Sequence, residues 1–565
     1  MLICGLKLTH DGAIALLRDS RLLFSIEVEK LANNSRYSKV PDLDLVVDVL
    51  RDRGFVPADV DRWVVDGWDG RESGLVRTVS GGVPLELPVA GYAELPDTDP
   101  LAVGATGRMP LGGLDVPYIS FVHTSGHLAG AYLGSPSARA GRPAFVLVWD
   151  GGSFPRLYLV ERGTGAVALG ATFPLFGHAY ALAGFHFGPY VRGAQPGELW
   201  VAGKLMAYIA KGRVSPAALE IFDRAFDEHF MDDGELAVSY RKSVGGYGSH
   251  VEPSRETTEA YLDDVGVQLA RISVCGDDAL TTFHHFLERK LVESVMQTAD
   301  ESGRSDVVDL CLAGGCALNI KWNTALRRSP RFQSVWVPPY CNDSGSALGV
   351  ALLGRTPGEA VVPFDWTVRS GPDLPVPPAP PAGWASRPCT PEQLAALLHE
   401  RGEPVVVLYG AAELGPRALG GRSILAPATQ RETKDRLNAI KGREDYRPVA
   451  PVCIEEESPR IFDPGTPDPY MLFDHRLRPG WAERVPAVVH LDGTARLETV
   501  GPNDDPVLRR VLLEYYRLSG VPVLCNTSAN ANGCGFFPDV ASAAAWGRVP
   551  IIWSQGQLYV QHASS

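Results

Sequence analysis

The chain has 565 residues, of which 45% are hydrophobic and 21% are charged. These values are typical of a folded globular protein and exclude a disordered chain, while the length exceeds what one ordinary hydrophobic core supports, so two or more domains are expected. The formal charge of −13 argues against nucleic acid as the main partner, because proteins that bind nucleic acids usually present a basic face.

The N-terminus has the pattern of the first strand of a fold. Residues 1–8 are mostly apolar but lack the basic start and long apolar stretch of a signal peptide, and no apolar run in the chain is long enough to span a bilayer. We therefore expect a cytoplasmic protein without a membrane partner. The nine cysteines include no Cys-x-x-Cys pair, which predicts reduced thiols rather than a zinc ribbon or a disulfide framework.

Strands and helices alternate in the first part of the chain, which predicts an α/β fold with mixed or parallel sheets. Helical spacing of apolar residues is clearest between Leu280 and Val295. The polar segment 213–257 is interpreted as an insertion. The expected strands are 1–8, 22–27, 62–66, 144–150 and 309–312, and the expected helices are 42–53, 123–133 and 277–300.

A proline-rich segment at 374–383 indicates the domain organisation. Proline at this density is incompatible with a helix interior or a central strand, so a linker or surface excursion is expected, with the domain boundary slightly before it. We predict domains at 1–357 and 358–565, and see no internal repeat. A second α/β domain is indicated by expected strands at 405–409, 424–426, 449–454 and 521–525.

Two histidines four residues apart, His123 and His127, are candidate metal ligands. At this spacing both imidazoles lie on one face of a helix, although for the pair alone two helix-surface histidines are the better explanation. Asp150 follows an apolar strand and Asp343 lies in a loop after the expected strand 335–337, where open α/β sheets place their ligands. Two imidazoles and two carboxylates would form a site suited to iron, manganese or zinc.

Two glycine-rich segments, 150–153 and 313–319, each follow an expected strand. Glycines allow backbone N–H groups to approach a phosphate closely, although either segment alone is compatible with a tight turn. Together they predict a nucleotide-binding cleft that includes Gly151, Gly152, Gly314, Gly315 and Asn319.

Basic residues gather in the second part of this acidic chain. A solvated helix face is the usual explanation of such a run, but arginines in irregular, glycine-rich segments are suited to a bidentate grip on phosphate. The polar segment 526–530 follows another strand and offers groups that would hold a planar amide or a phosphate, or form a common turn. The basic residues are Arg417, Arg422, Lys434, Lys441, Arg443 and Arg447.

Six segments occur in an order and at spacings that resemble carbamoyltransferases of the nodulation, tobramycin and cephamycin type, and the resemblance covers nearly the whole chain. Segments 313–319 and 415–420 are specific to that family, whereas the histidine pair is not. The remaining segments are 10–12, 123–127, 492–496 and 526–528.

The resemblance implies an N-terminal domain with the actin/hexokinase-like ATPase fold of the TsaD type, followed by a YrdC-like α/β domain. It implies an ATP-dependent O-carbamoyltransferase that moves the carbamoyl group of carbamoyl phosphate, through carbamoyl-AMP, to a hydroxyl of a small molecule, a secondary metabolite or a sugar. The adenylate would form in the C-terminal domain and react in the N-terminal one. The expected partners are carbamoyl phosphate, Mg-ATP and the acceptor, and the expected state is a monomer or homodimer.

The resemblance also implies residue roles. His123, His127, Asp150 and Asp343 would hold the metal, with iron expected and manganese or zinc as alternatives. His10 would take the proton of the acceptor hydroxyl, Asp11 would orient it or is a turn residue, and Lys39 matches a lysine near the nucleotide phosphates. Carbamoyl phosphate and ATP would be bound by Arg417, Lys441, Arg447, Arg496, Asn526 and Ser528.

Three other functions compete with this one. Threonylcarbamoyl transfer to tRNA uses the same pair of folds, but the acidic charge argues against a tRNA partner. The hydrogenase-maturation carbamoyltransferases carry Cys-x-x-Cys zinc motifs and an acylphosphatase segment, and neither is found in this sequence. A nucleotide- and metal-binding module without turnover would be expected to lose one of the two residue sets, and both are present.

Overall fold

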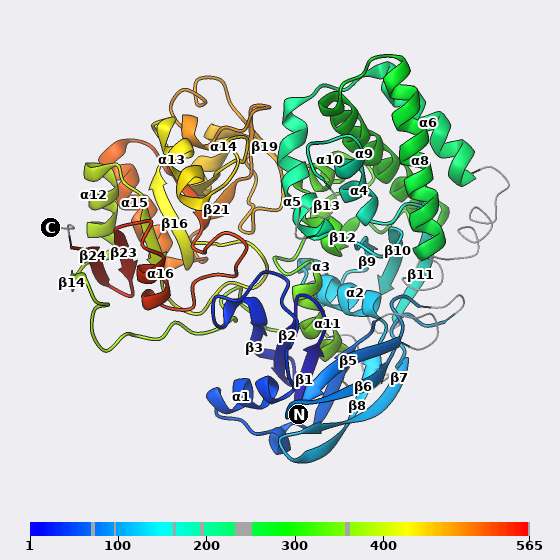
Figure 1. Cartoon of the computed structure of the whole chain (residues 1–565), viewed down its shortest axis with the longest axis horizontal. Helices are drawn as coiled ribbons and strands as arrows, with labels where there is room; N and C mark the ends of the chain where they lie inside the picture. Colours follow the sequence, from blue (N-terminus) through cyan, green and yellow to red (C-terminus); the bar gives the residue numbers. More distant parts are fainter. Residues whose placement is uncertain are drawn as a thin grey trace. The chain divides into compact units, whose positions relative to one another are not determined.

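The computed structural model describes residues 1–68, 74–94, 98–161, 165–191, 197–231, 251–355 and 362–562. The chain forms two compact units (Figure 1): one contains Met1–Ser25 and Lys39–Trp366, and the other contains Ile26–Ser38 and Thr367–Ser565. The boundary expected between residues 357 and 358 lies outside the described residues, as does much of the expected insertion 213–257. Among the described residues, no helix has both the length and the apolar character needed to cross a membrane.

The first sheet of the first unit has the strand order β3-β2-β1-β4-β8-β7. β1 (Leu2–Lys7) is antiparallel to β2 (Ala13–Arg18) and parallel to β4 (Arg62–Asp66), which is parallel to β8 (Leu114–Phe121). The remaining strands are β3 (Arg21–Glu27) and β7 (Ala105–Leu111), while β5 (Gly74–Ser80) and β6 (Val83–Val89) form a separate hairpin.

The second sheet has the order β11-β10-β9-β12-β13. Its strands are β9 (Ala144–Val148), β10 (Arg156–Glu161), β11 (Gly165–Ala171), β12 (Asp309–Ala313) and β13 (Ser334–Trp336). β9 is antiparallel to β10 and parallel to β12, which is parallel to β13. This arrangement repeats the β3-β2-β1-β4-β8 part of the first sheet, so the unit contains a topological duplication.

Two buried helices pack together (Figure 1), one against strands of the first sheet (α11) and the other against β9 and β12 of the second sheet described above (α2). They are α2 (His123–Leu133) and α11 (Ser346–Leu353), and nearly every residue of both is buried. Gly349 of α11 lies against Gly126 of α2, and a Cβ at Gly349 would collide with the backbone oxygen of Gly126. Glycine at this crossing therefore lets the two helices approach, which brings the loop before α11 close to the start of α2.

Helices make up most of the remainder of the first unit. The 26-residue helix α9 (Gly276–Glu301) contains the helical pattern seen in the sequence. It packs with α6 (Pro216–Phe226) and α10 (Ile320–Arg328). The other helices are α1 (Asp44–Asp52), α3 (Pro136–Arg139), α4 (His178–His186), α5 (Glu198–Tyr208) and α8 (Val251–Arg271).

The second unit is built on a mixed sheet with the order β14-β24-β23-β15-β16-β22-β17-β21. Alternate residues of its central strands enter two hydrophobic clusters: Val406 and Leu408 enter one, and Val405 and Val407 enter the other. The sheet is thus covered on both faces. Its strands are β14 (Trp384–Pro388), β15 (Val405–Leu408), β16 (Arg422–Pro427), β17 (Ala450–Ile454), β21 (Glu498–Val500), β22 (Val523–Ser528), β23 (Ile551–Ser554) and β24 (Gln557–Gln561).

Helices and a small sheet complete the second unit. The proline-rich segment 374–383 contains no helix or strand, as expected, but Leu374 is buried in the core of this unit. The helices are α12 (Pro391–Arg401), α13 (Glu432–Lys441), α14 (Ser458–Ile461), α15 (Pro506–Ser519) and α16 (Val540–Trp546), and the small sheet contains β18 (Phe462–Asp463), β19 (His475–Leu477) and β20 (Thr494–Ala495).

Candidate metal centre and anion site

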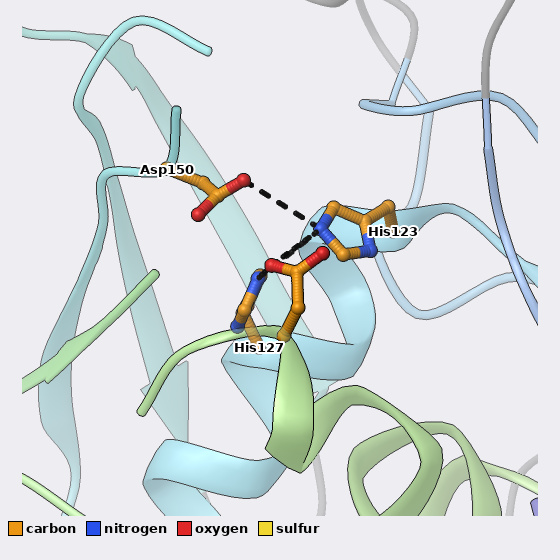
Figure 2. Close-up of side chains that lie close together, drawn as sticks. His123, His127 and Asp150 are labelled. Carbon is orange, nitrogen blue, oxygen red and sulfur yellow. Dashed lines mark hydrogen bonds and ion pairs between the residues drawn. The ribbon is translucent and has the colours of Figure 1, made fainter. Parts of the chain in front are cut away.

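The four candidate metal ligands meet in the first unit. His123 and His127 lie one turn apart at the start of α2, Asp150 follows β9, and Asp343 begins the short 3-10 helix before α11. Figure 2 shows the side chains of His123, His127 and Asp150 pointing toward one another. One ligand atom from each of the four residues lies within 4.8 Å of all the others, and all four residues are buried.

The distances and the donor types suit a divalent cation. His123 Nε2 is 3.2 Å from His127 Nε2 and 3.8 Å from Asp150 Oδ2. Asp343 Oδ1 is 3.4 Å from His123 Nε2 and 3.3 Å from His127 Nε2. Burial and the charge of Asp343 each raise the pKa of Asp150, whereas the nearby histidines lower it below its ordinary value. Two carboxylates and two imidazole nitrogens thus converge, the donor set that iron, manganese and zinc accept.

Further residues hold the ligands in place. His123 Nδ1 donates to Asp66 Oδ2 at 2.7 Å, which leaves Nε2 for the cluster. Tyr92 donates its hydroxyl proton to Asp150 Oδ2, and the backbone N–H of Gly315 donates to Asp150 Oδ1 at 2.7 Å. Sequence reasoning missed Asp66 and Tyr92. Asp66 could have been predicted, because it is the last residue of a mostly buried strand, and Asp150 likewise lies just after one.

His10 lies at the edge of this cluster. Its Nδ1 is 2.9 Å from Asp11 Oδ2 and its Nε2 is 3.6 Å from Asp343 Oδ2. The imidazole is 35% exposed and packs edge-on against Trp68. His10 therefore combines a carboxylate partner with access to solvent. Lys39 is exposed and has no ion-pair partner among the described residues, so its role near the nucleotide stays a prediction.

The glycine-rich segments pack around Asp150. Gly314 has φ +87°, and a Cβ there would collide with the backbone oxygen of Trp149. A Cβ on Gly151 would lie 2.7 Å from His178 Nε2. Asn319 Oδ1 accepts the N–H groups of the first turn of α10, whereas its buried Nδ2 has no partner in the described part of the chain. The predicted nucleotide contacts stay predictions: Gly151, Gly152, Gly314, Gly315 and Asn319.

A cluster of arginines lies in the second unit. Burial lowers the pKa of Arg496 well below its ordinary value, and the charges of Arg417, Arg443 and Arg447 lower it further. Burial and neighbouring cations, among them Arg36, likewise lower the pKa of Arg443 to about 9. The buried Nε of Arg496 has no hydrogen-bond partner among the described residues. Glu444 lies 3.9 Å from Arg447, and the charge of Asp468 acts on Arg496. Guanidinium groups gathered in this way are suited to bind an anion.

The loop that carries Arg417 is held by two buried charged residues. Glu413 Oε1 accepts the backbone N–H groups of Leu419, Gly421 and Arg422 at 2.7–3.2 Å. Lys30 Nζ donates to the backbone oxygens of Glu413 and Gly415 at 2.6 and 2.7 Å. Segment 26–38, which supplies Lys30 and Arg36, is therefore an integral part of the second unit, and no sequence motif indicated this.

The other predicted donor-site residues lie on or beside β22. Lys441 Nζ donates to the backbone oxygens of Ser528 and Asn530 and to the Asn530 side chain, so its three donors hold this loop. Asn526 Nδ2 donates to Ala418 O at 3.0 Å, which ties the loop to the segment after Arg417, while Asn526 Oδ1 is buried without a partner among the described residues. Sequence reasoning placed Arg443 in the basic run but omitted it from the site.

Replacing Glu413 with alanine should destabilise the second unit by about 3–5 kcal/mol, because three buried N–H groups lose their acceptor and Arg369 loses an ion-pair partner 2.9 Å away. Urea unfolding followed by hydrogen exchange in peptides from β15 and β16 measures the effect. Glu400→Ala, on an exposed position of α12, is the control. Equal urea midpoints for the two variants would contradict this role of Glu413.

Comparison with known proteins places these sites in a family. The chain matches a family model described as "Carbamoyltransferase N-terminus" over residues 2–93 and 111–352, and one described as "Carbamoyltransferase C-terminus" over residues 395–547. Nodulation protein U of Rhizobium tropici is 48% identical over 563 residues, which cover 99% of this chain and 96% of the relative.

A second kind of relative is more distant. The 3'-hydroxymethylcephem-O-carbamoyltransferase of Amycolatopsis lactamdurans is 34% identical over 544 residues, which cover 95% of this chain and 94% of the relative. The first family model covers the metal cluster, and the second covers Arg417, Arg443, Arg447 and Arg496 of the arginine cluster. The chain therefore belongs to the carbamoyltransferase family and is an enzyme of that class.

Proposed function

We propose that this enzyme is an ATP-dependent O-carbamoyltransferase, which moves the carbamoyl group of carbamoyl phosphate, through carbamoyl-AMP, to a hydroxyl of a small molecule. The observation that carries the proposal is the presence, in one chain of this family, of a buried His/Asp cluster and a separate cluster of arginines. Oxygen as the accepting atom is supported by the name of the cephem relative, which carbamoylates a hydroxymethyl group. A secondary metabolite or a sugar is the proposed acceptor.

Donor activation is assigned to the second unit, for which we retain the YrdC-like fold. Arg417, Arg447 and Arg496 would bind the phosphates of ATP and carbamoyl phosphate, since an array of cations neutralises and aligns such anions. Water hydrolyses carbamoyl phosphate to carbamate and phosphate, and a carbamate oxygen then attacks the α-phosphorus of ATP and displaces pyrophosphate. The unpartnered Oδ1 of Asn526 is suited to accept an N–H of the carbamoyl group.

Carbamoyl transfer is assigned to the first unit. Its duplicated sheet order supports the proposed actin/hexokinase-like ATPase fold of the TsaD type. The unpartnered Nδ2 of Asn319, beside the glycines of 313–319, suits a contact with the nucleotide. His10, held by Asp11, takes the proton of the acceptor hydroxyl as its oxygen bonds to the carbamoyl carbon and AMP departs. A general base contributes roughly a hundredfold to ten-thousandfold.

His123, His127, Asp150 and Asp343 would hold the divalent ion, with iron proposed and manganese or zinc as alternatives. Such an ion, when bound, supplies positive charge that polarises the carbamoyl carbonyl. The cytoplasm is the proposed location, supported by nine free cysteines, which are typical of a reducing compartment.

The test is a search for carbamoylated products. Purified enzyme is incubated with ATP, carbamoyl phosphate and a panel of hydroxylated metabolites, and mass spectrometry should detect a gain of one carbamoyl group on at least one of them. The gain should require both ATP and carbamoyl phosphate, and pyrophosphate should be released. Absence of pyrophosphate release would contradict the adenylate, and carbamoylation without ATP would contradict the whole scheme.

A further inference from the structure

Lys7, the last residue of β1, is buried beside the metal cluster, with a side chain only 1% exposed. Its Nζ lies 3.1 Å from Asp66 Oδ2 and 3.0 Å from Asp343 Oδ2. The ammonium group also lies 4.3 Å from the centre of the Trp68 ring. No motif in the sequence indicated a role for this lysine. It joins a metal ligand to the carboxylate that orients another ligand.

The two carboxylate oxygens of Asp343 have different neighbours. Oδ1 faces His123 and His127, at 3.4 and 3.3 Å, whereas Oδ2 faces Lys7 and, at 3.6 Å, His10. Only one oxygen of Asp343 is therefore directed at the metal position. Loss of the ammonium group would free Oδ2 to turn toward that position.

Lys7 also sets the charge of the cluster. Asp66, Asp150 and Asp343 together carry three negative charges, and Lys7 offsets one of them. Imidazoles bind metals in their neutral form, so the buried set carries a net charge of about −2 when the histidines are ligands. A divalent ion makes this set neutral. A trivalent ion leaves an excess positive charge, which a buried environment of low dielectric disfavours.

We propose that Lys7 is a positioning residue that keeps Asp343 a one-oxygen ligand and sets the cluster charge so that the site retains a divalent rather than a trivalent ion. The inference rests on the metal centre of the proposed function, but it requires no carbamoyl transfer. The two proposals can therefore be tested separately: a protein without carbamoyl transfer activity can still retain a divalent rather than a trivalent ion.

Iron serves as the probe, because its two oxidation states differ by one charge. Wild type, Lys7→Met, Asp66→Asn and the double variant are loaded anaerobically with Fe(II) and titrated with redox mediators, with Fe(III) measured by electron paramagnetic resonance. At the potential where wild type is half oxidised, Lys7→Met should have an Fe(III)/Fe(II) ratio at least about tenfold higher. Asp66→Asn should shift the ratio in the opposite direction, and the double variant should return toward wild type.

Lys211→Met removes the same charge at an exposed position and should leave the ratio unchanged. A purely structural role of Lys7 would not produce opposite shifts in the two single variants. Should Lys7→Met fail to fold, Lys7→Gln, which removes the same charge, is measured in its place. The proposal is overturned if the ratio in Lys7→Met stays within about twofold of wild type, if both single variants shift the same way, or if wild type binds no iron.

Discussion

His127→Ala should lose its bound metal and at least about a hundredfold of its carbamoyl transfer rate, since changes merely outside the ligand shell already cost tenfold to a hundredfold. The substitution removes one of the four donors that would hold the ion. Pyrophosphate release should stay close to the wild-type rate, because every residue proposed for donor activation belongs to the other unit. Metal content, transfer and pyrophosphate release are measured on the same preparation.

The matched control for this variant is His285→Ala, which removes a 44% exposed imidazole from α9. Chelation of the wild-type enzyme should reproduce the loss of transfer, and added divalent metal should restore it in wild type but not in His127→Ala. Normal transfer by metal-free His127→Ala would show that this cluster is not the metal centre of the reaction.

Arg496→Met should greatly slow donor activation and at the same time stabilise the ligand-free protein. Burial and the charges of Arg417, Arg443 and Arg447 lower the pKa of Arg496, which means that its guanidinium is disfavoured until an anion is bound. Loss of one such preorganised donor costs roughly a hundredfold to a thousandfold in rate. When a functional residue destabilises the folded protein, its replacement lowers the rate and raises the stability. Pyrophosphate release and thermal unfolding are the two measurements.

Arg401→Met, at the exposed C-terminal end of α12, is the control for the loss of a positive charge and should change neither quantity. A lower melting temperature for Arg496→Met would mean that the guanidinium is paired within the protein rather than reserved for an anion. Unchanged pyrophosphate release would remove Arg496 from the donor site.

Local periodicity explains why much of the fold was predictable. The helix expected at 123–133 occupies His123–Leu133, and that expected at 277–300 occupies Gly276–Glu301. Buried strands such as β9 and β12 are continuous apolar runs, which are conspicuous in a sequence. The β5–β6, β7–β8 and β10–β11 hairpins were missed. Apart from the buried β10, these strands are partly exposed, as in β11 (Gly165–Ala171), where two glycines and exposed residues weaken the strand pattern.

Contacts between distant segments were not predictable. Lys30 binds the backbone of Glu413, 383 residues away, and this places segment 26–38 in the second unit. The duplication of sheet order in the first unit leaves no visible repeat in the sequence, because many different apolar residues can occupy equivalent positions in a buried strand. Backbone hydrogen bonding fixes the topology, whereas side-chain identity at such positions is free to vary.

The sequence by itself determined the types of ligand and their nearest spacing: two imidazoles one helical turn apart, two carboxylates after strands, and arginines among glycines. Only the tertiary structure decided how these groups are used. It joins Asp66 to His123, assigns one oxygen of Asp343 to Lys7, and gathers arginines that repel one another. The physical reason is that a buried charge acquires its role from the charges that folding brings within a few ångströms of it, and these come from distant parts of the chain.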